Sequence, residues 1–384
     1  MERKNDKKRL WRQIVATLLI VCLAAALFGC SAEQHSASQT EEKTVNVPAE
    51  PLDAMEKVVA YVEDMARAGA EEFSIVCTEE IYNKLVRVSY QSDGFETCVY
   101  HSLLDQSGLY SYNVVTAGLK RTLTVSKASL YPGYEILRSI ENGTESKLSS
   151  KLKQTLTEAQ AMAEACRSDD PLETAKNIQA AICEKVRYAY MTNRSDVDTA
   201  IGPLVRGSAD CDGYADAFYL VGTLAGLEVR YQEGISSSYD HEKHKIVTGR
   251  HMWNLLKLDG TWRVVDVCWA DSEKGIDYTW FNIGKDRASH SRTWHEELSV
   301  PLLETTDLTT RPETEYSITN SEELETAIKE AIEQKLPSFT IIFDNKNYGS
   351  LNDTFDMMWN YYKGEPFYYW DECSRALTII LEGE

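Results

Sequence analysis

One stretch, residues 249–271, constrains the fold of this chain more than any other, because it predicts a β-hairpin of defined register. Asp259-Gly260 separates two alternating apolar runs. An Asp-Gly pair suits a type I′ turn, which needs a positive φ at both central residues. If these two residues form the whole turn, Leu258 faces Thr261, and every later pair of the two strands follows from that one.

This register brings a histidine towards a carboxylate. It pairs Trp253 with Asp266, and His251 with Cys268, so that all four side chains point to one face of the hairpin. His251 and Asp266 are then diagonal neighbours. A slip of one residue would place them on opposite faces of the sheet. The hairpin therefore predicts an imidazole oriented by an aspartate, which is the arrangement of a general base.

An oriented base implies a nucleophile, and the candidate is Cys211, in the run 207–216. The residues from Cys211 to Leu224 have helical spacing that ends near Gly226, so Cys211 is predicted at or next to a helix N-terminus. Free N–H groups and the helix dipole favour a thiolate there, which predicts a lowered thiol pKa. The alternative role for Cys211 is that of a small buried residue.

The three blocks resemble the transglutaminase-like superfamily. They are Cys211-Asp-Gly-Tyr-Ala, His251-Met-Trp-Asn and Val265-Asp266-Val-Cys-Trp269-Ala-Asp271, and they occur in the family's order within residues 170–300. The resemblance implies an α+β core of papain-like topology, in which a helix carries the cysteine and an antiparallel sheet carries His251 and Asp266. It also implies Cys211 as nucleophile, His251 as general base and acid, and Asp266 as the residue that orients His251. No residue matches an oxyanion-hole donor.

The chemistry that this resemblance implies is acyl transfer. The Cys211 thiolate attacks an amide carbonyl, the amine leaves with a proton from His251, and water or a second amine resolves the thioester. Water makes the protein a peptidase or amidase, whereas an amine makes it a cross-linking transglutaminase. The alternative is a non-catalytic binding or assembly module on the cell surface. The chemistry requires no metal and no organic cofactor.

Two further residue groups have candidate roles. Trp253 and Trp269 are candidates for lining a substrate groove, although alternating tryptophans in a hairpin more often serve packing. His241 and His244 have a helix-compatible spacing for metal ligands. No third ligand lies near them in the sequence, and they do not form a His-Glu-x-x-His motif. We therefore predict no metal site.

Residues 1–29 have the pattern of a signal peptide. A basic stretch precedes an apolar run that is too short for a comfortable membrane span. The run ends at Leu27-Phe28-Gly29-Cys30, which resembles a bacterial lipoprotein signal and predicts lipidation of Cys30. An uncleaved N-terminal anchor is the alternative. Both predict a protein that lies outside the cytoplasm, tethered to the cell membrane, with a peptide or protein of the cell envelope as its substrate.

Charge and cysteine content exclude two classes of protein. The chain has a formal net charge of −20, whereas nucleic-acid binding needs clustered Lys and Arg to neutralise phosphates, so we predict no nucleic-acid partner. Nine cysteines in an exported chain raise the question of disulfides. Without Cys22 in the signal and Cys30 at its end, an odd number remains, with no regular spacing. We therefore expect buried core cysteines rather than a disulfide framework.

A polar stretch over residues 30–50 predicts a disordered linker, and the rest is long enough for two or three domains. Between two flanking regions we predict a transglutaminase-like domain at residues 146–300.

The two flanking regions, 51–128 and 315–384, show the same helix-then-strand pattern. They correspond at a constant offset of 266 residues, which places Phe73 on Phe339 and Tyr82 on Tyr348. We therefore predict an N-terminal α/β module and a related C-terminal one. A coincidence between two generic helix–strand units is the alternative.

Overall fold

The computed structural model describes residues 46–90, 96–116, 121–189, 196–240, 245–272, 275–278, 280–289, 291–300, 315–336, 338–344, 351–363, 367–371 and 375–381. The predicted signal peptide, Cys30, and the histidines at 241 and 244 lie outside these residues, as does Tyr348. Among the helices of the described residues, none combines the length and the apolar character that crossing a membrane requires.

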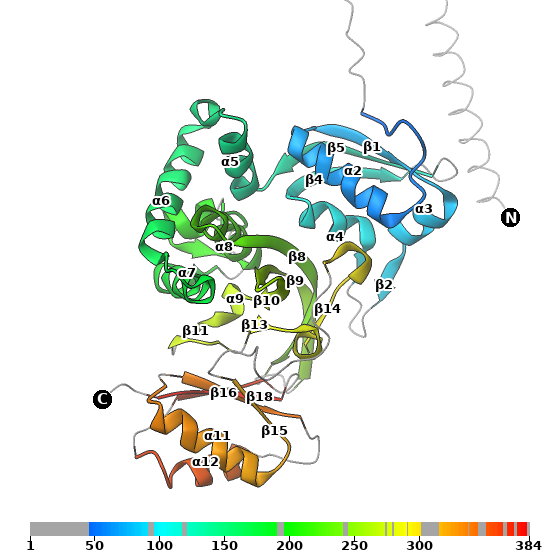
Figure 1. Ribbon diagram of the computed structural model, residues 1–384. Helices are drawn as coiled ribbons and strands as arrows, with labels where there is room; N and C mark the ends of the chain where they lie inside the picture. Colours follow the sequence, from blue (N-terminus) through cyan, green and yellow to red (C-terminus); the bar gives the residue numbers. More distant parts are fainter. Residues whose placement is uncertain are drawn as a thin grey trace, which may run out of the picture. The chain divides into compact units, whose positions relative to one another are not determined.

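The central part of the chain is built on an antiparallel sheet of five strands in the order β13-β10-β9-β8-β14 (Figure 1). The strands are β8 (Glu228–Asp240), β9 (Lys245–Leu258), β10 (Thr261–Val265), β13 (Phe281–Ile283) and β14 (Arg292–Thr293). Helix α8 (Cys211–Ala225) contacts both β8 and β9. This arrangement confirms the predicted α+β class, with the cysteine on a helix and His251 on the sheet.

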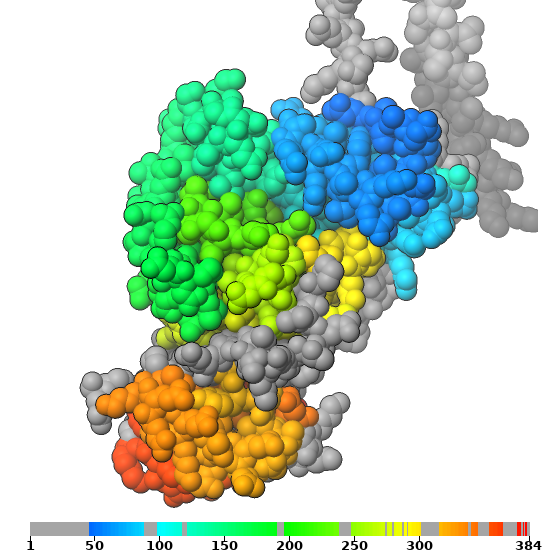
Figure 2. Space-filling view, viewed as in Figure 1, coloured from blue at the N-terminus to red at the C-terminus, as the bar shows by residue number. Residues whose placement is uncertain are grey.

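Three more helices pack around α8. They are α5 (Pro132–Glu141), α6 (Ser150–Cys166) and α7 (Pro171–Lys185), and each contacts α8. Figure 2 shows their residues, in shades of green, at the surface of this part of the molecule. The apolar faces of α6 and α7 point inwards, because Ala159, Ala163, Ile178 and Ile182 are all buried. Helix α8 is therefore enclosed between a helical layer and the sheet, which holds its N-terminus in place.

The hairpin formed by β9 and β10 has the predicted register. Leu258 pairs with Thr261, and Asn254 pairs with Val265. Asp259 and Gly260 have φ values of 48° and 79°, as a type I′ turn requires. Local turn chemistry alone was sufficient to align these two strands.

The hairpin ends earlier than predicted, so the expected pairings of Trp253 with Asp266 and of His251 with Cys268 are wrong. Asp266 lies just beyond the sheet and not on one of its strands, contrary to the predicted register. Strand β10 stops at Val265, and the chain turns into the short helix α9 (Val267–Ala270), which contains Cys268. Asp266 caps this helix, since its carboxylate accepts a hydrogen bond from the Trp269 N–H at 3.0 Å. The pairing ends here because the Asp266 backbone is held elsewhere, by a bond from its N–H to the Trp280 carbonyl.

Helix α8 begins and ends where the sequence predicts. Its N-cap is Asp210, whose carboxylate accepts a hydrogen bond from the Gly213 N–H, and it ends at Gly226 with a φ of 99°. Gly213 cannot be replaced by a larger residue, because a Cβ there would lie 2.1 Å from the Val197 carbonyl oxygen. The backbone approach at Gly213 fixes the first turn of α8, which carries Cys211.

The buried carboxylate of Asp216 ties α8 to its surroundings. It accepts hydrogen bonds from the N–H groups of Gly133, at the start of α5, and Ala200, and from the Tyr231 hydroxyl on β8. Three separate segments are thus anchored to the second turn of the helix that bears the cysteine.

The N-terminal module contains a three-stranded antiparallel sheet in the order β1-β5-β4. Its elements are α2 (Met55–Ala68), β1 (Glu72–Val76), α3 (Glu79–Leu85), β2 (Val88–Tyr90), β3 (Glu96–Cys98), α4 (Val99–Gln106), β4 (Leu109–Thr116) and β5 (Thr122–Leu130). Ahead of α2, Asn46 and Leu52 form parallel bridges with Phe73 and Cys77. Residues 46–50 of the expected linker therefore lie against the module.

The C-terminal module contains a four-stranded sheet in the order β15-β16-β18-β17. Its elements are β15 (Glu315–Ile318), α11 (Ser321–Glu333), β16 (Ser338–Phe343), α12 (Leu351–Met358), β17 (Phe367–Asp371) and β18 (Ala376–Ile380). Strand β15 runs parallel to β16, and the other pairings are antiparallel.

The two modules share a strand arrangement. In each, the strand after the first long helix pairs with the last strand, which pairs in turn with the strand before it. The matching pairs are Phe73 with Val125 and Ile75 with Leu123 in the first module, and Phe339 with Ile379 and Ile341 with Leu377 in the second. Phe73 and Phe339 therefore occupy equivalent strands, which supports the relation between the two modules.

Candidate active site

His251 and Asp266 form a buried hydrogen-bonded pair beside the end of the hairpin. The His251 Nε2 lies 2.7 Å from the Asp266 Oδ2, and the two residues are 6% and 0% exposed. Burial alone would raise the pKa of Asp266, but charges and hydrogen bonds from His251 and Arg292 hold that pKa well below its ordinary value. Asp266 is therefore ionised at neutral pH, and it fixes the orientation of the imidazole.

Arg292 is the second partner of the Asp266 carboxylate, and the sequence did not reveal it. Its guanidinium donates to the same carboxylate oxygen, Oδ2, and to the Ser291 hydroxyl. The Arg292 Cζ also lies 4.1 Å from the centre of the Trp269 ring and 4.2 Å from that of Trp280. The side chain is completely buried. Aromatic stacking and the ion pair together compensate for the desolvation of this charge.

Cys211 lies at the first position of α8, next to the strand that carries His251. The Met252 N–H is within hydrogen-bonding reach of the Cys211 sulfur. Because Met252 follows His251 on β9, this contact places the thiol beside the residue that bears the imidazole. The sulfur also lies 3.3 Å from the Asp212 Oδ1, to which the thiol donates.

The predicted lowering of the Cys211 pKa is wrong in direction. Burial raises the pKa of the Cys211 thiol well above its ordinary value, and the carboxylates of Asp212 and Asp210 raise it further, against the opposing bond from Met252. The helix N-terminus on which the prediction relied is occupied by its own cap, Asp210, which brings a negative charge to the same turn. In the resting protein Cys211 is therefore a neutral thiol.

Asp212 itself is a partly buried acid with an unusual pKa. Burial and the neighbouring Asp210 raise the pKa of Asp212 to about 7, although the Cys211 thiol and Arg250 act in the opposite direction. The protonation of a group in contact with the candidate nucleophile thus changes near neutral pH.

A second polar cluster lies beside the thiol and joins it to the N-terminal module. Arg250 on β9 donates to Glu233 on β8 and to Asp105 on α4, at 2.7 Å in each case. Tyr112 donates to the other oxygen of Asp105 at 2.9 Å. Burial and Glu233 raise the pKa of Asp105, whereas Arg250 lowers it. Two acids therefore share one arginine immediately before His251.

The two tryptophans proposed for a substrate groove differ in exposure. Trp253 is 1% exposed and packs with its ring centre 5.9 Å from that of His251. Trp269 keeps some exposed surface and stacks on His251 at 5.2 Å. Of the two, Trp269 is the one with surface available to a substrate. In the described part of the chain, no group of three or more His, Cys, Asp or Glu side chains is arranged to hold a metal ion.

The other described cysteines are mostly core residues. Cys77, Cys166, Cys183 and Cys268 are buried, and all six described cysteines are free thiols. Burial raises the pKa of Cys268, as do the negative charges around it, of which Asp266 is the first. These cysteines therefore serve as core residues, as the sequence indicated.

Comparison with known proteins identifies the same region. Residues 160–267 match the family model described as the transglutaminase-like superfamily. The human protein named Kyphoscoliosis peptidase is 29% identical over 104 residues, which cover 26% of this chain, and its mouse counterpart is 28% identical over the same length. The chain spans only 16% of the length of each of these curated relatives.

Among solved structures, two similar chains are a "TGase" and the periplasmic domain of TgpA from Pseudomonas aeruginosa bound to ethylmercury. The first is 11% identical, covers 48% of this chain and 49% of its own, and has a TM-score of 0.24. The second is 17% identical, covers 38% of this chain and 55% of its own, and has a TM-score of 0.25. Similarities at this level carry no functional conclusion.

Proposed function

We propose that this protein, which contains a transglutaminase-like domain related to peptidase-like proteins at residues 160–267, catalyses acyl transfer from peptide or protein amides. Cys211 is the nucleophile, His251 the general base and acid, and Asp266 the orienting residue. The observation that carries the proposal is the buried His251–Asp266 pair, held at 2.7 Å beside the strand position whose N–H faces the Cys211 sulfur. These contacts support the roles of nucleophile, base and orienting residue that such chemistry requires.

The first step transfers a proton from sulfur to imidazole. Because the His251 Nε2 is bonded to Asp266, the Nδ1 is the nitrogen left to take the thiol proton. The ionised Asp266 stabilises the imidazolium that results. The thiolate attacks the amide carbonyl, His251 returns the proton to the leaving amine, and the thioester is resolved by water or by a second amine.

The backbone supplies a donor for the oxyanion that forms on the carbonyl. In the first turn of α8, the N–H groups of Asp212 and Gly213 bond to the Asp210 carboxylate. The Cys211 N–H has no backbone acceptor among the described residues. A donor at a helix N-terminus, next to the nucleophile, is suited to stabilising a developing negative charge. We assign this role to the Cys211 N–H.

The proposed location rests on the sequence. The junction at Cys30 supports a lipid anchor, which would place the domain outside the cytoplasm at the cell membrane. The substrate class that fits this location is a peptide or protein of the cell envelope.

The test is labelling of the purified protein with a thiol-reactive probe, followed by peptide mapping, and in parallel the hydrolysis of peptide amides and the incorporation of a fluorescent primary amine. We expect labelling and turnover to be lost in Cys211→Ala and strongly reduced in His251→Ala, with a smaller loss in Asp266→Asn, which orients the base without touching sulfur. The buried Cys268 serves as an internal control. Equal labelling of Cys211 and Cys268, unchanged by His251→Ala, would refute the proposal.

One observation favours a second candidate, a binding or assembly module without catalysis. The thiol donates to Asp212, and the neighbouring carboxylates hold the pKa of Cys211 high. A resting thiol of this kind is poorly suited to attack. The two candidates separate in the same assay, since a binding module gives no turnover with any peptide amide, and Cys211→Ala then leaves the binding of its partner unchanged.

A further inference from the structure

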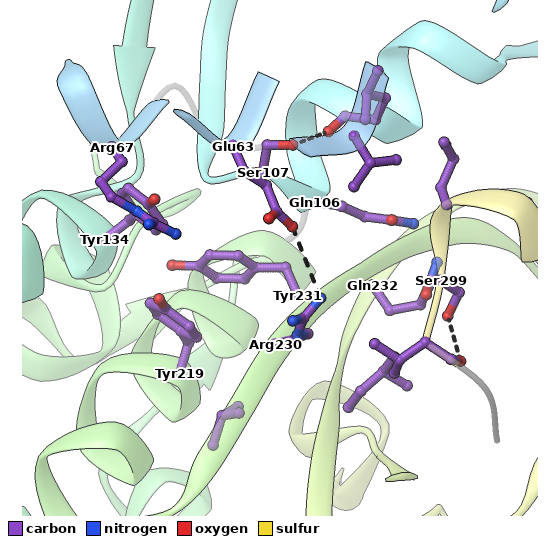
Figure 3. A pocket seen from close by; sticks show the side chains of 16 residues that line it. Glu63, Arg67, Gln106, Ser107, Tyr134, Tyr219, Arg230, Tyr231, Gln232 and Ser299 are labelled. Atoms are coloured by element: carbon purple, nitrogen blue, oxygen red, sulfur yellow. Dashed lines mark hydrogen bonds and ion pairs between the residues drawn. The ribbon is translucent and has the colours of Figure 1, made fainter. Parts of the chain in front are cut away.

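A pocket with a volume of about 200 Å³ lies between the N-terminal module and the edge of the central sheet (Figure 3). Its walls come from α2, α4, α5, α8, β8 and β9, and from the end of the 3₁₀ helix Glu296–Leu298 with the two residues that follow it. It contains none of the residues of the proposed triad. A cavity of about 150 Å³ holds one benzene ring, and sites for drug-sized ligands start at about 300 Å³, so this pocket suits one or two amino-acid residues.

Two glutamine side chains leave unpaired polar atoms at this pocket. Gln232 is 1% exposed, and its Oε1 is buried without a hydrogen-bond partner in the described residues, as is the Nε2 of Gln106. The orientation of the Gln232 amide is fixed, because its Nε2 donates to the Glu233 carbonyl at 2.9 Å, which leaves the oxygen free. In Figure 3 the two side chains come from opposite walls, α4 and β8.

Leaving a buried donor and a buried acceptor without hydrogen-bond partners costs free energy of folding. The two groups together therefore indicate that a ligand supplies the missing partners. A peptide unit satisfies both. Its carbonyl oxygen accepts from the Gln106 Nε2, and its N–H donates to the Gln232 Oε1.

The charges at the pocket favour a carboxylate. Arg67 forms no ion pair among the described residues, and its guanidinium bonds to the Tyr134 hydroxyl. The Glu63 Oε1 lies 3.8 Å from the Arg230 Nη1, so the charge of the one acidic residue that lines the pocket is balanced by Arg230. A positive charge at Arg67 remains, on a chain whose formal net charge is −20. An arginine that is already held by a tyrosine is well placed to bind a planar carboxylate.

Three tyrosines, Tyr134, Tyr219 and Tyr231, form an aromatic part of the pocket wall. Tyr219 stacks with Tyr134 at an interplanar angle of 12°, and its ring centre lies 4.3 Å from that of Tyr231. The Tyr231 hydroxyl is held by Asp216, so the ring presents its face and edge rather than its polar end. Such a surface packs against a side chain without demanding a particular one.

We propose that this pocket binds the C-terminal residue of a peptide, with its amide group between Gln106 and Gln232 and its terminal carboxylate on Arg67. The site deepens the proposed function, because it adds a place where a peptide substrate is recognised apart from the reacting bond. Strand β8 links the pocket to the candidate active site, because Gly234, two residues beyond Gln232, pairs with His251 on β9.

The test uses calorimetric titration of the full-length Cys211→Ala protein, so that binding is measured without turnover. The probes are N-acetyl-Ala-Ala, its C-terminal amide, and the ester analogue that lacks the last peptide N–H. We expect the acid to bind and each analogue to lose at least tenfold in affinity. Binding of the acid and its amide with equal affinity, or no binding of the acid at millimolar concentration, would overturn the proposal.

Matched variants locate the site. Arg67→Ala should lose at least tenfold in affinity for N-acetyl-Ala-Ala, whereas Lys57→Ala, an exposed cation on the same helix, should lose none. Gln106→Leu should abolish binding without lowering the melting temperature of the unliganded protein, because it removes an unpaired buried donor. A fall in melting temperature with unchanged affinity would show that Gln106 has only a structural role. If only the proposed function is wrong, the result differs: the pocket still binds N-acetyl-Ala-Ala, but Cys211 of the wild-type protein shows no reactivity and no turnover.

Discussion

Replacing Asp212 by Asn should increase the reactivity of Cys211. The change removes a carboxylate 3.3 Å from the sulfur and keeps the size and shape of the side chain. Because Asp212 is a cause of the raised pKa of Cys211, its neutralisation lowers that pKa and increases the thiolate fraction at a given pH.

The size of the effect follows from the distance. Two unit charges 3.3 Å apart interact by about 5 kcal/mol at an effective dielectric constant of about 20. Since the sulfur is partly exposed, we take about half of this value, which corresponds to a change of about 100-fold in the thiolate fraction. A less basic thiolate is also a weaker nucleophile, with a Brønsted slope of about 0.4 to 0.5. The net expectation is an alkylation rate about tenfold higher.

The pH profile tests this reasoning more sharply than one rate does. The pKa of Asp212 is about 7, so below that pH the wild-type residue is already neutral and the two proteins should react alike. The difference should appear as the pH rises through 7 and reach its full size above it. The assay is alkylation by iodoacetamide from pH 5.5 to 9, with the Cys211 peptide quantified by mass spectrometry.

Two further variants serve as controls for Asp212→Asn. Asp210→Asn should give a smaller increase in the same direction, because Asn also caps helices and Asp210 is the lesser of the two charges on the thiol. Asp53→Asn, which changes an exposed carboxylate of the N-terminal module, should have no effect on the rate. A folded Asp212→Asn protein whose Cys211 reacts no faster than wild type at pH 8 would refute the electrostatic account.

Three other outcomes follow from the same structure. Arg292→Met should destabilise the fold by about 3 to 5 kcal/mol in urea unfolding, since it leaves a buried charge on Asp266 with one partner fewer, and a loss below 1 kcal/mol would contradict the buried pair. Asp212 should make wild-type stability fall between about pH 4 and pH 7, because the folded state retains its proton in that window while the unfolded state loses it. Asp212→Asn should show a smaller fall than wild type, by at most about 4 kcal/mol, in unfolding free energies measured against pH, since the buried Asp105 and Asp216 contribute falls of the same sign in both proteins. Cys30→Ala should release the protein from the membrane fraction, and unchanged sedimentation with membranes would refute the lipid anchor.

The hairpin was predictable because its determinants are local. Asp259-Gly260 selects a turn type, the turn type sets the register, and the register holds for every pair up to Val265. The end of the strand was not predictable in this way. Asp266 suits both a strand position facing His251 and a helix cap, and the choice depends on a backbone bond to Trp280, which follows fourteen residues later.

The residues that tune the site were hidden for a related reason. Arg292 follows Asp266 by 26 residues and lies in a segment whose sequence suggests only a polar loop. The sign of the Cys211 pKa was missed because the prediction weighed the helix dipole but not the carboxylates of Asp210 and Asp212, which flank Cys211 in the same turn. Burial, which dominates the thiol's pKa, is a property of the assembled fold.

The residues that complete the site also extend beyond the matched family region. Residues 160–267 include Cys211, His251 and Asp266, but not Arg292, which shares the Asp266 carboxylate, nor Asp105, which holds Arg250 beside His251. Because Asp105 comes from α4, the N-terminal module contributes directly to the strand that carries the base. A fragment limited to the matched region would leave a buried Asp266 with one cation fewer, and would leave Arg250 with Glu233 as its remaining partner. We therefore expect a fragment that keeps the contacts of Asp266 and Arg250 intact to include the N-terminal module and the segment through β14.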